Sequence, residues 1–248
     1  MRWPAAVVGT AALFRHHRAP ALVTPVGEFY AHRYRSGIFV FPGLAGETAD
    51  FYRQQAIDSF FWGYCPTVGD SVIDVGAGIG EETLTASRLV GKNGRIMAIE
   101  AHPTTFKRLE LMCQLNHLDN VIPIQCAVTA QTGTAHIQND VNYVGAALIP
   151  EGGVEVPAAS LDDLCASVPG DIDLVKINIE GAEREAIRGM DRTIARTRNV
   201  VISCHDFLGA GTATFEEVSG FIRGQGFQIA TRPDDPLPWN RFMVYGHR

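Results

Sequence analysis

Short β-branched runs alternate with amphipathic helical windows from Asp70 to the end of the chain. Parallel strands need long crossover connections, usually helices, so this alternation predicts βαβ units around a mostly parallel sheet. The expected strands lie near residues 71–75, 95–99, 121–125, 172–178, 199–204, 226–231 and 241–246. The expected helices lie near residues 80–90, 103–116, 161–167, 181–190 and 213–224. The predicted fold class is therefore α/β, with a Rossmann-like, doubly wound sheet.

The first 65 residues differ in character, so we expect an N-terminal extension over 1–65 and one α/β domain over 66–248. Glu28–Phe41 alternates apolar and polar residues around Ser36-Gly37, which predicts a hairpin with a tight turn. A helix is expected over about Ala49–Tyr64. Its apolar side chains that could form an aromatic cover are Phe51, Ile57, Phe60 and Phe61. The extension is interpreted as a lid or dimerisation element, and a homodimer is the hypothesis that follows.

The composition and net charge of the chain argue against some classes of binding partner. The 248 residues are 46% hydrophobic and carry a formal net charge of −6, which suits one sizeable core and offers no positive field for nucleic acid or anionic membranes. The five cysteines are scattered without metal-type pairing, which is typical of a reducing compartment and predicts a cytoplasmic protein. The apolar run Pro4–Phe14 is shorter than the ~20 residues that span a bilayer, so we expect it to pack on the main domain.

The stretch Ser71–Thr83, SVIDVGAGIGEET, has the pattern of a buried strand, a glycine turn and the start of a helix. Such a turn brings backbone N–H groups close to a nucleotide at the carboxyl end of the strand. Glu100 ends the next expected strand, twenty residues after Gly80, where a carboxylate can accept hydrogen bonds from both ribose hydroxyls. The pair predicts an adenosine-containing ligand. The alternative is a tight turn followed by helix-capping acids.

Charge helps to choose among adenosine ligands. The loop glycines are Gly76, Gly78 and Gly80, which is not the G-x-G-x-x-G spacing of dinucleotide sites, because Glu81 holds the third fingerprint position. Glu81 and Glu82 would place two carboxylates where a pyrophosphate has to sit. S-adenosylmethionine carries a sulfonium and an ammonium and no phosphate. Asp74 beside the loop and an acidic rim are compatible with that cation.

Four segments occur in order between Asp70 and Asp206: IDVGAGIG, AIEAHP, VEVPAASLDDL and DLVKINIEGAEREAIRGM. This set resembles the FkbM-type methyltransferases, a branch of the class I S-adenosylmethionine-dependent enzymes. The resemblance implies a seven-stranded sheet whose last strand is antiparallel, with the cofactor across its carboxyl edge. It also implies that residues 66–248 form the methyltransferase domain. The expected reaction is methyl transfer to oxygen, often on a sugar, glycolipid or polyketide-type natural product.

The resemblance assigns the cofactor site position by position. The glycine loop would contact the methionine portion of S-adenosylmethionine, Glu100 the ribose, and the segment after the third strand the adenine. The predicted cofactor-binding residues are Asp74, Gly76, Ala77, Gly78, Glu100, Ala101, Cys126, Ala127 and Asn178. Asn178 stands where many members of the family have Asp, which removes one anionic ligand. A divalent metal held by His205, Asp206 and Glu180 is therefore possible but not favoured.

Methyl transfer is an in-line displacement, for which a protein supplies alignment, desolvation and, for a hydroxyl nucleophile, a proton acceptor. The strand ends at residues 178–180 and 203–206 should open onto one crevice. The predicted catalytic residues there are His205, Asn178, Glu180 and Asp206. His205 is the expected general base because a free imidazole has a pKa near ~6.5, with Asp206 or Glu180 orienting it. Trp239 and Arg241 are expected to border the acceptor pocket.

Purely structural roles for these residues also stay open. His205 could be a loop histidine bonded to a backbone carbonyl, and Glu180 and Glu183 could simply stabilise a helix N-terminus. Three functions also stay open. They are an O-methyltransferase with an amide nitrogen or a peptide as alternative acceptor, a nicotinamide-dependent oxidoreductase, and a non-catalytic nucleotide-binding protein of the same fold. The missing third glycine and Glu81 argue against the second of these.

Overall fold

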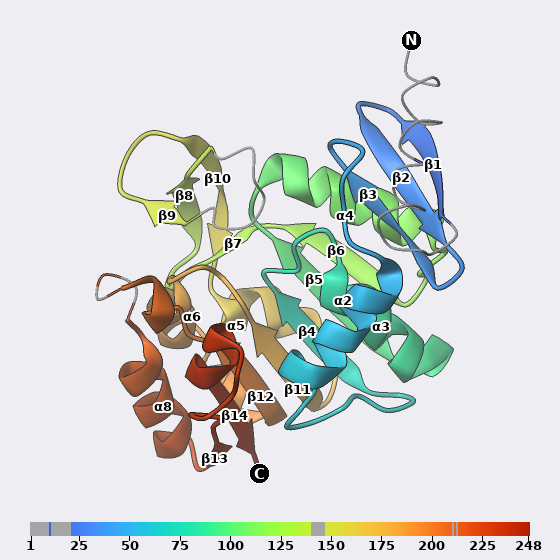
Figure 1. The fold of residues 1–248 in the computed structure, drawn as a ribbon. Helices are drawn as coiled ribbons and strands as arrows, with labels where there is room; N and C mark the ends of the chain where they lie inside the picture. The colour runs from blue at the N-terminus through green and yellow to red at the C-terminus, as the bar shows by residue number, and fades with distance from the viewer. Residues whose placement is uncertain (1–9, 11–20, 140–146, 210, 212) are drawn as a thin grey trace.

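The computed structural model describes residue 10 and residues 21–139, 147–209, 211 and 213–248 (Figure 1). Apart from Thr10, the apolar run Pro4–Phe14 lies outside the described residues. Among the described residues, no helix is both long enough and apolar enough to cross a bilayer.

The central feature of the described part is a seven-stranded sheet in the order β13-β14-β12-β11-β4-β5-β6. The strands are β4 (Ser71–Val75), β5 (Arg95–Glu100), β6 (Val121–Gln125), β11 (Ile172–Ile177), β12 (Thr197–Ser203), β13 (Gln228–Ala230) and β14 (Met243–His247). Neighbouring pairs from β6 to β12 are parallel, while β14 runs antiparallel to both β12 and β13. All seven expected strands are present with ends shifted by up to two residues, so the Rossmann-like prediction is confirmed.

Helices cover both faces of this sheet, as a doubly wound fold requires (Figure 1). They are α3 (Glu81–Val90), α4 (Pro103–Leu115), α5 (Leu161–Leu164), α6 (Glu183–Arg188), α7 (Asp191–Ala195) and α8 (Phe215–Gly224). Pro103 occupies the first turn of α4, and the Ser160 hydroxyl caps α5 by accepting from the Asp163 N–H at 3.1 Å. The single helix expected over 181–190 is instead α6 followed by α7, because Gly189 ends α6.

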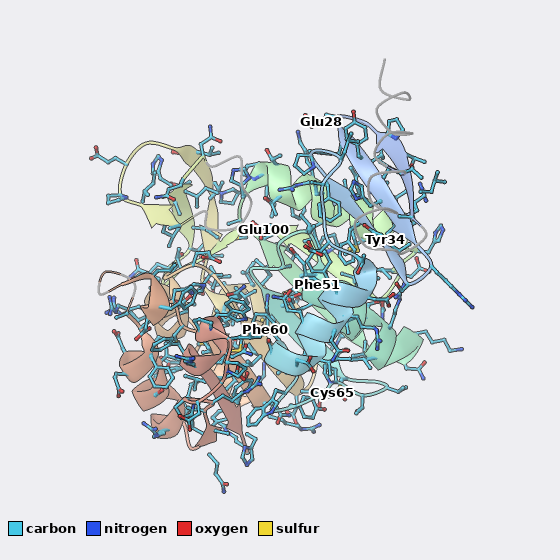
Figure 2. All side chains as sticks on the ribbon, viewed as in Figure 1. Glu28, Tyr34, Phe51, Phe60, Cys65 and Glu100 are labelled. Carbon is cyan, nitrogen blue, oxygen red and sulfur yellow. The ribbon has the colours of Figure 1, made fainter. Side chains whose placement is uncertain are left out.

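The N-terminal extension packs on one face of the sheet. It contains β1 (Ala21–Val26), β2 (Phe29–Tyr34), β3 (Gly37–Phe41), α2 (Ala49–Gln55) and the π-helix η1 (Ala56–Phe60). The predicted hairpin is β2 and β3, whereas β1 and its pairing with β2 were not predicted. Phe60 and Phe61 are buried as a cover, but Phe51 is 48% exposed and is not part of it. Figure 2 labels Phe51 and Phe60 on this helical segment.

The extension and the main domain share one apolar core. Phe39 and Tyr52 belong to the same buried cluster as Leu84 and Met112 from α3 and α4. Asn116 fastens β3 to the end of α4, since its side chain accepts from the Ile38 N–H at 3.0 Å and donates to the Ile38 carbonyl at 2.7 Å. The extension is therefore continuous with the domain in packing.

A small second sheet lies beside the main one and was not predicted. Its order is β7-β10-β8-β9, from the strands β7 (Ala127–Val128), β8 (Gly133–Ile137), β9 (Leu148–Ile149) and β10 (Val154–Ala159). Figure 1 shows β8, β9 and β10 as a yellow-green lobe that projects from the body of the molecule. The lobe follows β6 and β7 in the chain, so it stands at the carboxyl edge of the main sheet.

Candidate active site

A cavity of about 470 Å³ opens at the carboxyl ends of the central strands. Its floor comes from the ends of β4, β5, β11 and β12, which is where doubly wound sheets bind ligands. Three further elements supply its walls: the α2–η1 segment, the small sheet, and the 3-10 turns η4 (Asp206–Leu208) and η6 (Pro238–Phe242). The wall side chains from these elements are Tyr52, Gln55, Phe60, Ile137, Leu148, Phe207, Leu208 and Trp239.

The glycine loop forms one side of the floor, and its first glycine is required by space. Gly76 has φ +71°, and a Cβ there would lie 1.8 Å from the backbone oxygen of Asn178. The N–H groups of Gly76 and Ala77 both donate to the Ile99 carbonyl at 2.9 Å. The loop is therefore clamped between the ends of β5 and β11, with its backbone facing the cavity.

Glu100 ends β5 in contact with this loop. Its Oε2 accepts from the Gly78 N–H at 3.0 Å, and its Oε1 accepts from the His102 N–H at 2.8 Å. Burial raises the pKa of Glu100 to about 7, against the lowering effect of these two hydrogen bonds. The side chain lines the cavity, where the sequence places the ribose ligand.

Lys176, a residue to which the sequence analysis gave no role, lies beneath the loop and is almost fully buried. Its Nζ is 2.9 Å from Asp74 Oδ1 and 3.2 Å from Glu82 Oε2, and it donates to the Gly76 carbonyl at 2.9 Å. Burial lowers the pKa of Lys176, but the two carboxylates outweigh that effect and raise it. This Lys176 cluster holds the glycine loop from below. A lysine inside the apolar run DLVKINI was the available signal.

The Lys176 cluster changes the predicted charge of the site. Asp74 is buried and also accepts from the Thr83 hydroxyl at 2.6 Å, so it lies below the loop and is not among the residues that line the cavity. Glu82 shares Lys176 with it. Burial, followed by the charge of Glu82, raises the pKa of Glu81 to about 8. The cradle is thus less anionic at neutral pH than the sequence alone suggests.

His205 follows β12 and is buried against two glutamates. Its Nδ1 is 2.8 Å from Glu183 Oε1, and its Nε2 is 3.5 Å from Glu180 Oε1. Glu183, the first residue of α6, is fully buried and also accepts from the Thr214 hydroxyl at 3.0 Å and the Gly181 N–H at 3.1 Å. The three side chains, named here the His205 cluster, run from the protein interior to the cavity, which Glu180 and His205 line.

The backbone at Glu180 is unusual for a residue with a side chain. Its φ of +55° is left-handed, a conformation that costs roughly 1–2 kcal/mol outside glycine. Gly181 follows with φ +95°. This turn connects β11 to α6, and such strain is concentrated at functional sites.

The charge state of His205 differs from the expectation. Burial lowers its pKa, but the hydrogen bonds and charges of Glu180 and Glu183 outweigh burial and raise the pKa to about 9. The imidazolium therefore predominates at neutral pH, whereas a general base needs the neutral ring. Glu183, not Asp206, orients the ring, because Asp206 Oδ2 accepts from the N–H groups of Thr214 and Phe215 at the start of α8.

Comparison with known proteins identifies the family. The Methyltransferase FkbM domain model matches residues 74–229, more than half of the chain. This chain belongs to the FkbM methyltransferase family. It is an S-adenosylmethionine-dependent methyltransferase.

Three curated relatives are methyltransferases by name. Methyltransferase 1 of Beauveria bassiana is 27% identical over 240 residues, which cover 85% of this chain and 94% of the relative. Hexuronic acid methyltransferase AglP of Haloferax volcanii is 24% identical over 183 residues, covering 67% of this chain and 72% of AglP.

Solved structures support the fold. A methyltransferase FkbM from Methylobacillus flagellatus aligns with TM-score 0.57 at 17% identity, over 81% of this chain, which spans half of that chain's length. Aeropyrum pernix fibrillarin, solved with natively bound S-adenosyl-L-methionine, aligns with TM-score 0.51 at 14% identity, over 92% of this chain and 99% of fibrillarin.

The FkbM enzyme has a cavity whose residues fit S-adenosylmethionine. Gly76 and Gly78 present loop backbone to the cavity, Glu100 offers carboxylate oxygens, and the small side chains of Ala101 and Ala127 leave room for a flat ring. When bound, the cofactor supplies a methyl group on a positively charged sulfur. The predicted site residues that line the cavity are Gly76, Gly78, Glu100, Ala101, Cys126, Ala127, Asn178, Glu180, His205 and Trp239. Asp74, Ala77, Asp206 and Arg241 are not among the described lining residues.

A metal site formed by His205, Asp206 and Glu180 would require the three side chains to converge. His205 and Glu180 meet, while the Asp206 carboxylate is taken up by the start of α8. Among the described residues, no group of three or more His, Cys, Asp or Glu side chains is arranged to hold a metal ion.

Proposed function

We propose that the enzyme transfers the methyl group of S-adenosylmethionine to a hydroxyl oxygen of a small molecule. One observation carries the proposal: a single cavity has the glycine loop and Glu100 on one side and the Glu180–His205 pair on the other. The first side suits the cofactor. The second places a carboxylate beside the His205 ring, and a carboxylate is the proton acceptor that a hydroxyl nucleophile requires.

The walls describe the rest of the acceptor. Phe207, Leu208 and Trp239 line the mouth and are 39%, 59% and 37% exposed, so an apolar surface faces the incoming molecule. Aromatic planes suit sugar faces and apolar rings. A sugar, glycolipid or polyketide-type natural product with a free hydroxyl has both features. AglP acts on a hexuronic acid by its name, which supports a sugar-related acceptor.

Binding is the first test. Calorimetry and thermal shift should show that S-adenosylmethionine binds and stabilises the protein whereas NAD does not, since a ligand specific for the native state raises apparent stability. Preferential binding of NAD would contradict the proposal.

Transfer is the second test. The protein would be incubated with methyl-labelled S-adenosylmethionine and a panel containing a monosaccharide, a glycolipid, a hydroxylated polyketide and a short peptide. NMR would then locate the transferred methyl group. Transfer to a hydroxyl oxygen is the expected result. Transfer to the peptide nitrogen alone would replace the O-methylation proposal with N-methylation, and cofactor binding without transfer to any of them would contradict the proposed classes of acceptor.

A further inference from the structure

The three side chains of the His205 cluster differ in how exposed they are. Glu183 is fully buried, the His205 side chain is 3% exposed, and the Glu180 side chain is 23% exposed and lines the cavity. Each imidazole nitrogen faces a carboxylate oxygen, Nδ1 at 2.8 Å and Nε2 at 3.5 Å. The ring lone pair that a general base needs is therefore directed at a glutamate and not at an acceptor.

We propose that Glu180 accepts the proton of the acceptor hydroxyl, that His205 acts as an imidazolium that positions Glu180, and that Glu183 is a positioning residue that fixes His205. This inference rests on the proposed O-methylation. Glu180 is the most exposed member of the cluster, and its left-handed backbone sets its side chain at the cavity. Glu183 does not line the cavity, and His205, which does, has a glutamate oxygen opposite each of its ring nitrogens.

The transfer balances in charge and atoms. Before reaction the cluster holds two carboxylates and one imidazolium. The acceptor O–H proton passes to Glu180 while the oxygen lone pair bonds the methyl carbon, and the pair of the broken carbon–sulfur bond stays on sulfur. The cluster loses its negative charge as the cofactor loses its positive one. Glu180 then returns its proton to water through the cavity.

Three other groups that the structure describes near His205 leave this balance intact. Asp206, the next residue along the chain, directs a carboxylate oxygen to the amides of Thr214 and Phe215. Burial raises the pKa of Cys204, so this neighbour stays a neutral thiol. The Phe207 ring packs near the imidazole at 5.5 Å between centroids. Glu180 and Glu183 thus set the charge state of His205.

The first experiment needs no acceptor. NMR titration of histidine-labelled protein should show His205 titrating above neutral pH, and Glu183→Gln, which keeps the side-chain shape, should lower that pKa. Glu185→Gln is the matched control, because Glu185 lies on the same helix but pairs with Arg188 at the surface. A His205 resonance that titrates near ~6.5 and ignores Glu183→Gln would overturn the positioning role.

The second experiment measures single-turnover transfer to the best hydroxyl acceptor of the panel across pH 6–9. Glu180→Gln should slow transfer about 10²- to 10⁴-fold, the usual worth of a proton acceptor. Glu183→Gln should slow it about 10- to 100-fold and shift the pH profile, because a misplaced group loses alignment. Glu185→Gln should match the wild type. S-adenosylmethionine affinity, measured by calorimetry, should stay within about threefold in every variant.

The outcomes separate the two proposals. If the wild type methylates a hydroxyl and Glu180→Gln retains activity within about threefold, O-methylation stands and the proton-acceptor role is refuted. If Glu183→Gln lowers activity without moving either the His205 titration or the pH profile, Glu183 is merely structural. If the wild type binds S-adenosylmethionine and methylates no hydroxyl, both proposals fail together.

Discussion

Two buried ion clusters lie at the same edge of the sheet, and each places one cation between two carboxylates. Lys176 sits between Asp74 and Glu82 beneath the glycine loop, and His205 sits between Glu183 and Glu180 beside the cavity. The lysine cannot lose its proton near neutral pH, whereas the imidazole titrates at about 9. The same charge pattern thus gives a cation that stays charged in one place and a titratable cation in the other. The identity of the cation and its access to the cavity make the difference.

Removing the lysine should have the largest effect. Lys176→Met leaves two buried carboxylates without their cation, and breaking such a cluster costs about 3–5 kcal/mol of unfolding free energy. Urea unfolding measures this loss, with the exposed Lys92→Met as control. A loss below about 1 kcal/mol would mean that the Lys176 cluster does not support the fold as described.

Gly76 tests the loop that Lys176 supports. Gly76→Ala puts a methyl 1.8 Å from the Asn178 oxygen, so the loop must move, and we expect S-adenosylmethionine to bind about 100-fold more weakly. Gly27→Ala is the control, because Gly27 has φ +54° but nothing within 4 Å of a Cβ. Equal cofactor affinity for Gly76→Ala and wild type, by calorimetry, would show that the loop has room to spare.

The pH dependence of stability distinguishes the titratable cluster from the fixed one. The folded-state pKa of His205 lies above its unfolded value, so its contribution is present in full below pH ~6.5 and is lost as pH rises through about 9. That contribution is on the order of 3 kcal/mol, since the pKa rises from 6.5 to about 9 on folding and one pKa unit is worth about 1.4 kcal/mol. Glu183→Gln should flatten the decline in unfolding free energy between these pH values.

The wild type has to be compared with Glu183→Gln because His205 is not the only group that lowers the unfolding free energy as pH rises. Glu81 and Glu100 also have raised pKa values, so both destabilise the fold as pH rises through about 8 and 7. They are present in wild type and variant alike. Parallel pH profiles for the two proteins would remove His205 from the explanation.

Asp206 should give the smallest effect. Asp206→Ala removes the acceptor for two amides at the start of α8, which is expected to cost about 1 kcal/mol, as for other helix caps. Methyl transfer should remain within about threefold of wild type, because Glu183 and not Asp206 holds His205. A loss of activity much larger than the loss of stability would return Asp206 to the catalytic set.

The fold could be predicted from local signals. The seven main strands are apolar runs bounded by turns, and Pro103 and Ser160 mark helix starts on the basis of a few neighbouring residues. β1 and the small sheet could not be predicted in this way. Strands such as β7 and β9 have two residues each, and their pairing depends on partners elsewhere in the chain.

A residue's position at the cavity was predictable wherever it lies at or just after the end of a strand. Glu100, Asn178 and His205 reach the cavity for that reason. Lys176 contacts Asp74, which lies about 100 residues earlier in the chain, and Glu183 contacts His205, which lies 22 residues later. No local pattern encodes such contacts. Asp206 illustrates the converse, since its neighbour His205 suggested chemistry while its carboxylate serves a helix.

The Phe60 ring, contributed by the N-terminal extension, lies 5.0 Å from the Lys176 ammonium and also faces the cavity. A protein shortened to begin at residue 66 would therefore lose part of the cavity wall. It would also lose the aromatic ring that packs against the Lys176 ammonium beneath the glycine loop. The N-terminal extension lies outside the sheet motifs, yet it supplies part of the cavity wall in this molecule.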